Sequence, residues 1–153
     1  MSNGAIRFSE EVEYYTPKYI VDKFGPFDFD PATTEGQALK HGIWNFSDKE
    51  HDGLSMVWTC YNRIWINPPF TRKKEFLKKA VDTWKLSRNE IYILLPISFL
   101  TTKSFHDIVK GAKIYLPNSR IKFESPTGEL RSPAFGSVVI KLQDNWEIEP
   151  LEI

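Results

Sequence analysis

The sequence predicts an α/β fold built on a mostly parallel sheet, and the order of its strand-like and helix-like segments carries this prediction. Short apolar segments of strand length, such as residues 63–66 and 91–95, alternate along the chain with segments whose apolar residues recur at helical spacing. Strands that are joined by helices in this order form right-handed β-α-β units with parallel strands. The chain has 153 residues, which is the length of an ordinary single domain. We therefore expect one domain over residues 1–153.

The first part of the chain contains the weaker secondary-structure signals. Thr16 is expected to cap a short helix, with Pro17 at its first position and Gly25 just past its end. Residues 27–31 predict a short strand that ends at an Asp-Pro pair. Residues 32–62 show no regular period, so we expect mostly loop there, with fragments of helix and strand.

The patterns become regular after residue 62. Apolar residues at helical spacing predict a helix over residues 73–86, with one stripe made of Phe76, Leu77, Ala80, Val81 and Trp84. The other predicted elements are a short helix over 104–109, ended by Gly111, and strands over 63–66, 91–95, 113–116 and 136–142. This order of strands and helices is typical of an α/β sheet.

Composition excludes several classes of protein. The chain contains no run of 18 or more apolar residues, and its first residues resemble no leader segment, so we expect a cytoplasmic protein without membrane association. Cys60 is the single cysteine, and no Cys or His spacing resembles a zinc site, so no metal is expected. His41, His51 and His106 have no triad partners in the sequence pattern and receive no role.

The charges divide unevenly along the chain. The totals of 20 basic and 20 acidic side chains give a formal charge of zero, which argues against strong non-specific binding to nucleic acid. However, residues 1–60 hold 5 Lys or Arg and 10 Asp or Glu, a net of −5, whereas residues 61–153 hold 15 and 10, a net of +5. This division leaves room for a basic face on the second part of the chain.

The segment with the most unusual chemistry is Asn67-Pro68-Pro69-Phe70, which follows the strand predicted over residues 63–66. Ligands of open α/β sheets bind at the carboxyl ends of strands. The Asn67 side-chain oxygen and the Pro68 carbonyl accept hydrogen bonds, and the prolines stiffen the loop that aims them. Phe70 adds a flat apolar ring. Two acceptors beside a ring suit a planar heterocycle with an exocyclic amino group, and a strand that ends in a proline turn is the simpler structural alternative.

This tetrapeptide resembles the Asp/Asn/Ser-Pro-Pro-Tyr/Phe motif of S-adenosylmethionine-dependent amino-methyltransferases that act on DNA bases. The chain is similar, over residues 14–142, to the small phage-type DNA N6-adenine methyltransferases of the Dam-like family, because further short motifs follow the same order. These motifs are Tyr15-Thr16-Pro17, Phe29-Asp30-Pro31-Ala32, Asp52-Gly53-Leu54, Leu94-Leu95-Pro96, Arg120-Ile121-Lys122-Phe123 and Ser132-Pro133-Ala134-Phe135-Gly136-Ser137.

The resemblance implies a fold and a cellular setting. The fold is a compact Rossmann-like class I methyltransferase sheet, mostly parallel, with helices on both faces and an antiparallel last strand. The resemblance also implies a single methyltransferase domain without a separate target-recognition domain. Its place would be the cytoplasm of a bacterial or phage-infected host cell. The oligomeric state and the target sequence are not implied.

The resemblance further implies S-adenosylmethionine as the cofactor. Asp30 is similar to the Asp of the first cofactor motif, near the methionine end, although the sequence around it lacks the glycine-rich turn of the broader superfamily. Asp52 would accept a hydrogen bond from the cofactor's adenine amino group, and Leu54 would pack on that adenine. For each Asp an ordinary loop turn is the alternative. The implied cofactor-binding residues are Tyr15, Thr16, Pro17, Asp30, Pro31, Ala32, Asp52, Leu54 and Asn67.

The implied reaction is methyl transfer to the N6 amine of an adenine that is flipped out of DNA. Asn67, Pro68, Pro69 and Phe70 would be the catalytic residues. In this hypothesis the Asn67 oxygen and the Pro68 carbonyl accept the amino hydrogens, Phe70 stacks on the base, and the amine attacks the methyl group in line.

The sequence also contains basic candidates for contact with DNA, and it leaves two other functions open. Basic residues near the predicted strand ends are candidates for contacts with DNA phosphates; they are Arg72, Lys73, Arg120 and Lys122. One alternative is an N4-cytosine methyltransferase, whose substrate amine is similar, although Asn67 in the first motif position favours adenine. The other is a non-catalytic module of the same fold that binds S-adenosylmethionine or nucleic acid.

Overall fold

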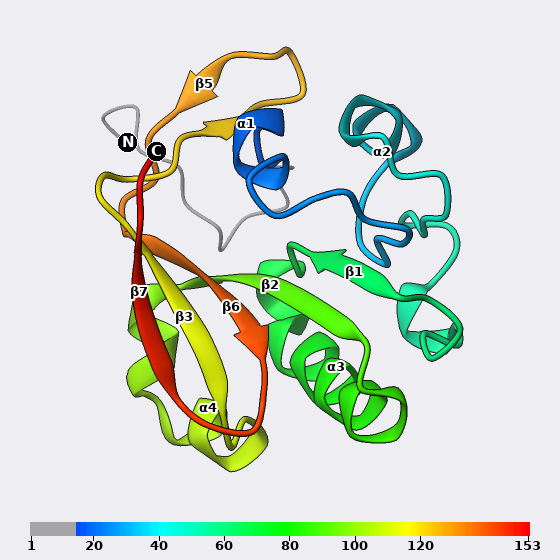
Figure 1. Ribbon diagram of the computed structural model, residues 1–153. Coiled ribbons are helices and arrows are strands. Elements are labelled where there is room, and N and C mark those ends of the chain that lie inside the picture. The colour runs from blue at the N-terminus through cyan, green and yellow to red at the C-terminus, as the bar shows by residue number, and fades with distance from the viewer. Residues whose placement is uncertain (1–14) are drawn as a thin grey trace.

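The computed structural model describes residues 15–153 and centres on a five-stranded sheet with the order β1-β2-β6-β3-β7 (Figure 1). β1 pairs parallel with β2, and β3 pairs parallel with β7. β6 lies between β2 and β3 and is antiparallel to both, so four strands run in one direction and one runs against them. The strands are β1 (Arg63–Ile66), β2 (Glu90–Pro96), β3 (Ala112–Pro117), β6 (Ser137–Leu142) and β7 (Glu147–Leu151).

Short helices and turns connect these strands, and a separate two-stranded hairpin follows β3. The hairpin is formed by β4 (Phe123–Glu124) and β5 (Leu130–Arg131). The α-helices are α1 (Lys18–Val21), α2 (Glu35–His41), α3 (Lys73–Ser87) and α4 (Lys103–Ile108). Three 3-10 turns are η1 (Gly53–Ser55), η2 (Phe70–Arg72) and η3 (Ile97–Thr101).

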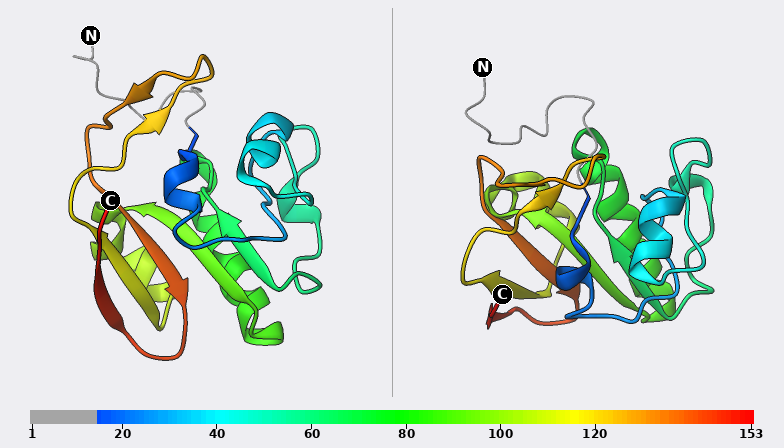
Figure 2. Two further views of the ribbon diagram at one scale, coloured as in Figure 1. Left: turned by 45° about the horizontal axis from the view of Figure 1, so that its top comes forward. Right: turned by 90° about the horizontal axis from the view of Figure 1, so that it is seen from above.

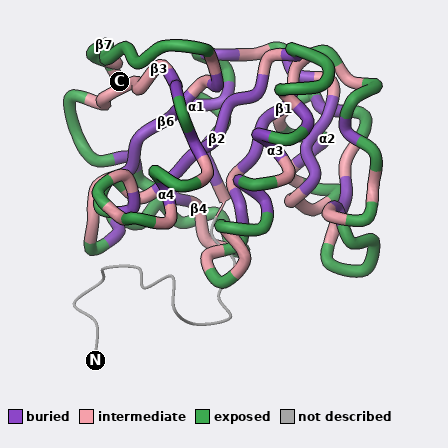
Figure 3. Tube along the Cα trace, turned by 90° about the horizontal axis from the view of Figure 1, so that it is seen from below, coloured by how far each residue is buried: buried purple, intermediate pink, exposed green. Residues whose placement is uncertain are grey.

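Two apolar cores lie on opposite faces of the sheet, because successive strand residues point to opposite sides. On one face, Ile91, Ile93 and Leu95 of β2 pack with the apolar stripe of α3 and with Phe105 of α4. On the other face, Tyr92 and Leu94 of β2 pack with residues of α1 and α2. Helices therefore cover both faces, and the buried residues concentrate along the central strands (Figure 3).

The regular part of the sequence prediction is confirmed. All four strands predicted after residue 62 are present, and the predicted long helix is α3, with the expected stripe buried apart from the half-buried Trp84. The expected antiparallel strand is also present as β6, but it is not the last strand. The true last strand, β7, carries glutamates and a proline and is largely exposed, which is typical of an edge strand and explains why apolar patterning did not predict it.

The predictions for the first part of the chain are only partly correct. Residues 27–31 form no regular strand; Phe29 and Asp30 make isolated parallel bridges to Ile64 and Phe46. Thr16 does not cap α1, since the N-cap position is held by Pro17 without a side-chain hydrogen bond. The irregular segment after residue 31 contains one clear helix, α2.

Elements distant in sequence meet at the edge of the sheet where β1, β2 and β3 end. The β4–β5 hairpin and α1 lie over this edge (Figures 1 and 2). Backbone hydrogen bonds of 2.9 Å in both directions between Tyr15 and Glu124 join the entry to α1 with the hairpin. Among the described residues, no helix is long and apolar enough to cross a membrane.

Candidate active site

The Asn67-Pro68-Pro69-Phe70 segment leaves the carboxyl end of β1 and turns directly into η2 and α3. Pro68 is buried and Pro69 is exposed. The Pro69 carbonyl accepts a hydrogen bond from the Arg72 backbone N–H at 3.0 Å, which closes the turn. Because both prolines lack an N–H, the strand ladder cannot continue through them, and the chain bends at this point.

A pocket that is partly open to solvent lies beside this turn. Its walls come from the ends of β1 and β2, the start of β6, and Phe123 of β4. The lining residues are Asn67, Pro68, Phe70, Lys73, Leu94, Leu95, Pro96, Phe123, Phe135 and Ser137. A mainly apolar wall with a few polar groups is the usual composition of a small-molecule site.

Lys73 forms part of the pocket wall. Its ammonium group lies 4.1 Å from the ring centroid of Phe70 and 5.0 Å from that of Phe99. Burial, with a smaller contribution from the neighbouring Lys74, lowers the pKa of Lys73. The structure thus places Lys73 against two aromatic rings, where a cation is attracted by the ring faces, and not on the outer face of α3.

Thr16 and Asn67 meet although 51 positions separate them in the sequence. The Asn67 side-chain amide donates a hydrogen bond from Nδ2 to the Thr16 hydroxyl at 3.1 Å. Thr16 is almost fully buried, and Pro17 beside it accepts the first backbone hydrogen bonds of α1. The sequence predicted Thr16 and Asn67 as members of one site, and the structure brings them into direct contact.

Asp30 is a buried carboxyl group in an irregular segment that pairs through its backbone with residues 45–47. Its backbone N–H donates to the Asn45 carbonyl and its carbonyl accepts from Ser47, at 3.0 and 2.9 Å. The carboxyl oxygen accepts a hydrogen bond from the Ala32 N–H at 2.9 Å. Burial raises the pKa of Asp30 to about 7, and the Ala32 hydrogen bond lowers it in part.

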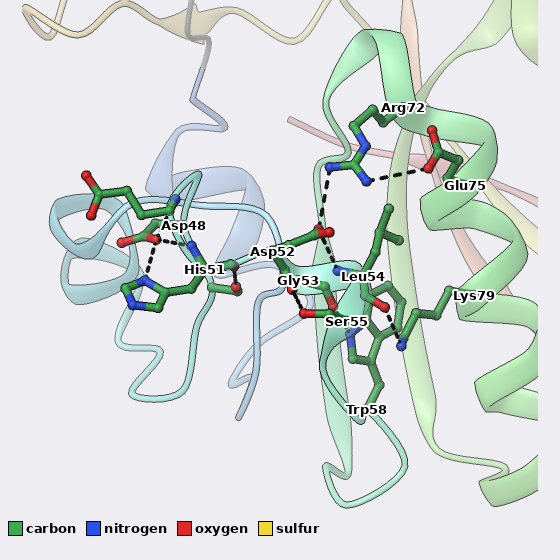
Figure 4. Close-up of polar contacts among 12 residues, drawn as sticks. Asp48, His51, Asp52, Gly53, Leu54, Ser55, Trp58, Arg72, Glu75 and Lys79 are labelled. Atoms are coloured by element: carbon green, nitrogen blue, oxygen red, sulfur yellow. Dashed lines mark hydrogen bonds and ion pairs between the residues drawn. The ribbon is translucent and has the colours of Figure 1, made fainter.

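The Asp52–Leu54 turn packs directly against the loop that contains Asp30. Asp52 accepts a hydrogen bond from the Leu54 N–H at 3.1 Å and pairs with Arg72 at 3.4 Å (Figure 4). A Cβ atom on Gly53 would lie 2.0 Å from the Pro31 carbonyl oxygen, so only glycine fits there. The two predicted cofactor loops are therefore neighbours in space.

Side chains from the helix side and from the core anchor this turn. Trp58 donates from Nε1 to the Gly53 carbonyl and Lys79 donates from Nζ to the Leu54 carbonyl, each at 2.8 Å (Figure 4). Lys79 reaches the turn from α3. The turn is consequently fixed on both sides by side chains, although it belongs to no regular sheet or α-helix.

The three predicted phosphate contacts other than Lys73 occupy three different settings. Arg72 is half-buried and forms ion pairs with Asp52 and Glu75, so its charge is already partnered. Arg120 donates to the Pro133 carbonyl at 3.1 Å, which ties together the two ends of the segment that carries the hairpin. Lys122 is exposed beside the hairpin. The prediction that these residues contact DNA remains a prediction.

Several residues of the pocket were not predicted from the sequence. Phe123, Phe135, Ser137 and the Leu94-Leu95-Pro96 segment were part of the ordered motifs but received no role, because motif order alone does not say which side chains converge. His41 was also missed; its Nε2 lies 2.9 Å from the Thr16 carbonyl. Across residues 15–153, no three His, Cys, Asp or Glu side chains are arranged to hold a metal ion.

These features define an α/β protein with a small, partly aromatic pocket at the carboxyl ends of its strands and two acidic loops nearby. The comparisons with known proteins specify the class further. A family model described as DNA N-6-adenine-methyltransferase (Dam) matches residues 12–151. The chain therefore belongs to the Dam family of DNA N-6-adenine-methyltransferases.

Two phage proteins named DNA N-6-adenine-methyltransferase are similar to the chain. The protein of Haemophilus phage HP1 is 31% identical over 121 residues, which cover 77% of this chain and 65% of the phage protein. The protein of Escherichia phage T1 is 31% identical over 78 residues, which cover 51% of this chain and 31% of the phage protein. The chain thus matches less than two thirds of the length of each relative.

Proposed function

We propose that the protein transfers a methyl group from S-adenosylmethionine to the N6 amine of an adenine in DNA. The observation that carries the proposal is the pocket itself, because Asn67, Pro68 and Phe70 of one short motif line it together. Family membership supports the same conclusion. The proposal includes a Rossmann-like methyltransferase sheet and a single domain without a separate target-recognition domain.

The residues of the two acidic loops fit the proposed cofactor. S-adenosylmethionine carries a sulfonium and an ammonium cation at its methionine end. Asp30 is a buried carboxyl group whose pKa is set by burial and one backbone hydrogen bond, with no basic side chain of the described residues contributing. A buried carboxylate of this kind suits a cationic ligand group. In our proposal Asp30 holds the methionine end, and Asp52 and Leu54 hold the adenine.

The residues of the pocket would orient the target amine. When bound, S-adenosylmethionine supplies a methyl group on positively charged sulfur. Asn67 and the Pro68 carbonyl accept the two amino hydrogens of an extruded adenine, and Phe70 stacks on its ring. Held in this way, the amine nitrogen would attack the methyl carbon in line; the carbon–sulfur bond would break with its electron pair left on sulfur, and the amine would lose one proton to water.

This arrangement accelerates the reaction chiefly by positioning. Asn67 is neutral, so it acts through its dipole: the carboxamide oxygen stabilises the positive charge that develops on the amine. Holding the amine and the methyl group in line converts an encounter between two molecules into a step within one complex. A narrow pocket beside a strand end is well suited to this task because its walls are fixed by the sheet.

The test is to identify the methylated base. Purified protein is incubated with isotopically labelled S-adenosylmethionine and unmethylated DNA, the DNA is digested to nucleosides, and the products are analysed by mass spectrometry. We expect labelled N6-methyl-2′-deoxyadenosine. N4-methyl-2′-deoxycytidine would keep the mechanism but change the substrate. Cofactor binding with no methylated base on several DNAs would contradict the proposal and favour a non-catalytic binding module.

A further inference from the structure

The Thr16 side chain contacts a residue of the pocket wall and does not cap α1, the helix that it precedes. Thr16 is only 2% exposed, and α1 has no side-chain cap. The hydroxyl oxygen instead accepts the hydrogen bond from Nδ2 of Asn67 at 3.1 Å. A buried hydroxyl with a partner so far away in the sequence therefore has a role other than local helix capping.

His41, at the end of α2, holds the backbone of Thr16. Its Nε2 lies 2.9 Å from the Thr16 carbonyl, which accepts hydrogen bonds only, so Nε2 carries the hydrogen. The other ring nitrogen, Nδ1, is buried without a hydrogen-bond partner among the described residues. Burial lowers the pKa of His41, which agrees with a neutral ring in this tautomer. The chain of contacts thus runs from His41 through Thr16 to Asn67.

In this contact the donor end of the Asn67 carboxamide faces Thr16. A carboxamide has one donor end and one acceptor end, so an Nδ2 that donates to Thr16 turns the oxygen away from Thr16. If the amide were flipped, its NH2 group would face the NH2 group of the target base, and two donors would oppose each other. The orientation of this one side chain therefore matters for the proposed reaction.

We infer that Thr16 is a positioning residue, whose hydroxyl holds the Asn67 carboxamide in the orientation that presents its oxygen to the target amine. His41 holds the Thr16 backbone in place through the contact with its carbonyl. This inference rests on the proposed methyl transfer. It assigns the Thr16 side chain to Asn67 and not to the cofactor, which differs from the role that family resemblance implies for the Tyr15-Thr16-Pro17 motif.

Two substitutions of Thr16 test this assignment. Thr16→Val keeps the size of the side chain but removes the hydroxyl acceptor, whereas Thr16→Ser keeps the hydroxyl. At saturating S-adenosylmethionine and DNA, Thr16→Val is expected to lower kcat about tenfold or more, the effect of one lost positioning hydrogen bond. The dissociation constant for S-adenosylmethionine is expected to stay within about twofold of wild type, and Thr16→Ser is expected to restore most of the lost kcat.

A threonine outside the site provides a matched control. Thr102 caps α4, where its hydroxyl accepts a hydrogen bond from the Phe105 N–H at 3.2 Å. Thr102→Val makes the same chemical change and loses two hydrogen bonds, because the Thr102 hydroxyl also donates to the Phe99 carbonyl at 2.7 Å. It should therefore lower the melting temperature while kcat stays near wild type. A loss of kcat in Thr16→Val alone is then not a general consequence of reduced stability.

Each outcome has one meaning. A higher dissociation constant for S-adenosylmethionine in Thr16→Val, with kcat unchanged at saturation, would make Thr16 a cofactor ligand and overturn the inference. An unchanged kcat and an unchanged dissociation constant would overturn it as well, while wild-type turnover would leave the proposed function standing. If the wild-type protein methylates no DNA, the proposed function fails and the inference fails with it.

Discussion

The two halves of the candidate site are built by different means. The pocket around Asn67 and Phe70 is formed by the ends of β1 and β2 and the start of β6, so the hydrogen-bonded sheet fixes its walls. The acidic half, with Asp30 and Asp52, lies in irregular chain. It is held by a short backbone pairing with residues 45–47, by side-chain hydrogen bonds and by the close approach of Gly53 to Pro31.

This difference indicates how each half of the site should respond to substitutions. Strand ends place pocket residues through many backbone contacts, so a substitution there changes chemistry and leaves the fold intact. The acidic half depends on a few specific contacts and also buries a carboxyl group, which is costly for folding. We therefore expect substitutions in the pocket to change turnover, and substitutions in the acidic half to change stability and cofactor affinity together.

The largest effect on stability is expected from Asp30→Asn. Because burial raises the pKa of Asp30 from 3.8 to about 7, the folded protein becomes less stable as the pH rises from 3.8 through 7. Asparagine does not ionise and still accepts the Ala32 hydrogen bond. The variant should be more stable than wild type at pH 8 by on the order of 4 kcal/mol, and equal to it below pH 3.8.

Urea unfolding of both proteins at several pH values measures this difference. The same variant should bind S-adenosylmethionine more weakly if Asp30 holds the cationic end of the cofactor. An equal stability of Asp30→Asn and wild type at pH 8 would contradict the account of the acidic half, because Asp30 would then carry no burial cost.

The second-largest effect on stability is expected from Gly53→Ala. The added Cβ would lie 2.0 Å from the Pro31 carbonyl oxygen, so the two acidic loops must separate. We expect a loss of about 1–3 kcal/mol in the free energy of unfolding and a higher dissociation constant for S-adenosylmethionine. Thermal unfolding and calorimetric titration measure both quantities.

Gly36→Ala is the matched control for this prediction. Gly36 lies in α2, and a Cβ added there meets no atom within 4 Å. Alanine is the better helix former, so this variant should be more stable by up to about 1 kcal/mol. If Gly36→Ala and Gly53→Ala behaved alike, close packing of the two loops would not be the cause.

A substitution in the pocket should change turnover without changing cofactor binding. Phe70→Leu removes the ring on which the base is proposed to stack, and stacking on an aromatic side chain contributes about 1–3 kcal/mol per base. We expect kcat/KM for DNA to fall about tenfold or more while the dissociation constant for S-adenosylmethionine is unchanged. Phe70→Tyr keeps the ring, so its kcat/KM for DNA should fall less. A parallel loss of cofactor affinity in Phe70→Leu would contradict the division between the two halves.

The smallest effect is expected from Lys122→Ala. Lys122 is exposed on the hairpin side of the site, and a phosphate contact there would make binding salt-dependent. Removing it should weaken DNA binding several-fold and reduce the slope of log affinity against log salt by about 1. Lys78 on α3, which pairs with Asp82 at 3.5 Å, is the control and should leave the slope unchanged on substitution. Equal slopes for Lys122→Ala and wild type would show that Lys122 makes no phosphate contact.

The sequence predicted the pocket half better than the acidic half, and the reason is physical. The strand before Asn67 and the stripe of α3 follow regular periods, so their positions and their buried faces were readable. Asp30 is placed by backbone pairing with residues 45–47, which leaves no periodic pattern. The contact between Thr16 and Asn67 joins two segments that only the folded chain brings together, so the sequence assigned both residues to one site but did not predict their contact.

The hairpin and β7 were missed for related reasons. β4 and β5 contribute two residues each, too few for an alternating pattern to be visible. β7 alternates glutamate with apolar residues but contains Pro150, which a central strand would exclude and an edge strand tolerates. Tertiary pairing with β3 decides the conformation of this segment.

In the proposed reaction Asn67 acts on the target amine and not on the cofactor. The most direct measurement is the single-turnover rate of DNA methylation by Asn67→Ala, together with its dissociation constant for S-adenosylmethionine. We expect the rate to fall by about a hundredfold or more, while the cofactor still binds within severalfold of wild type. A methylation rate close to that of wild type would contradict the account.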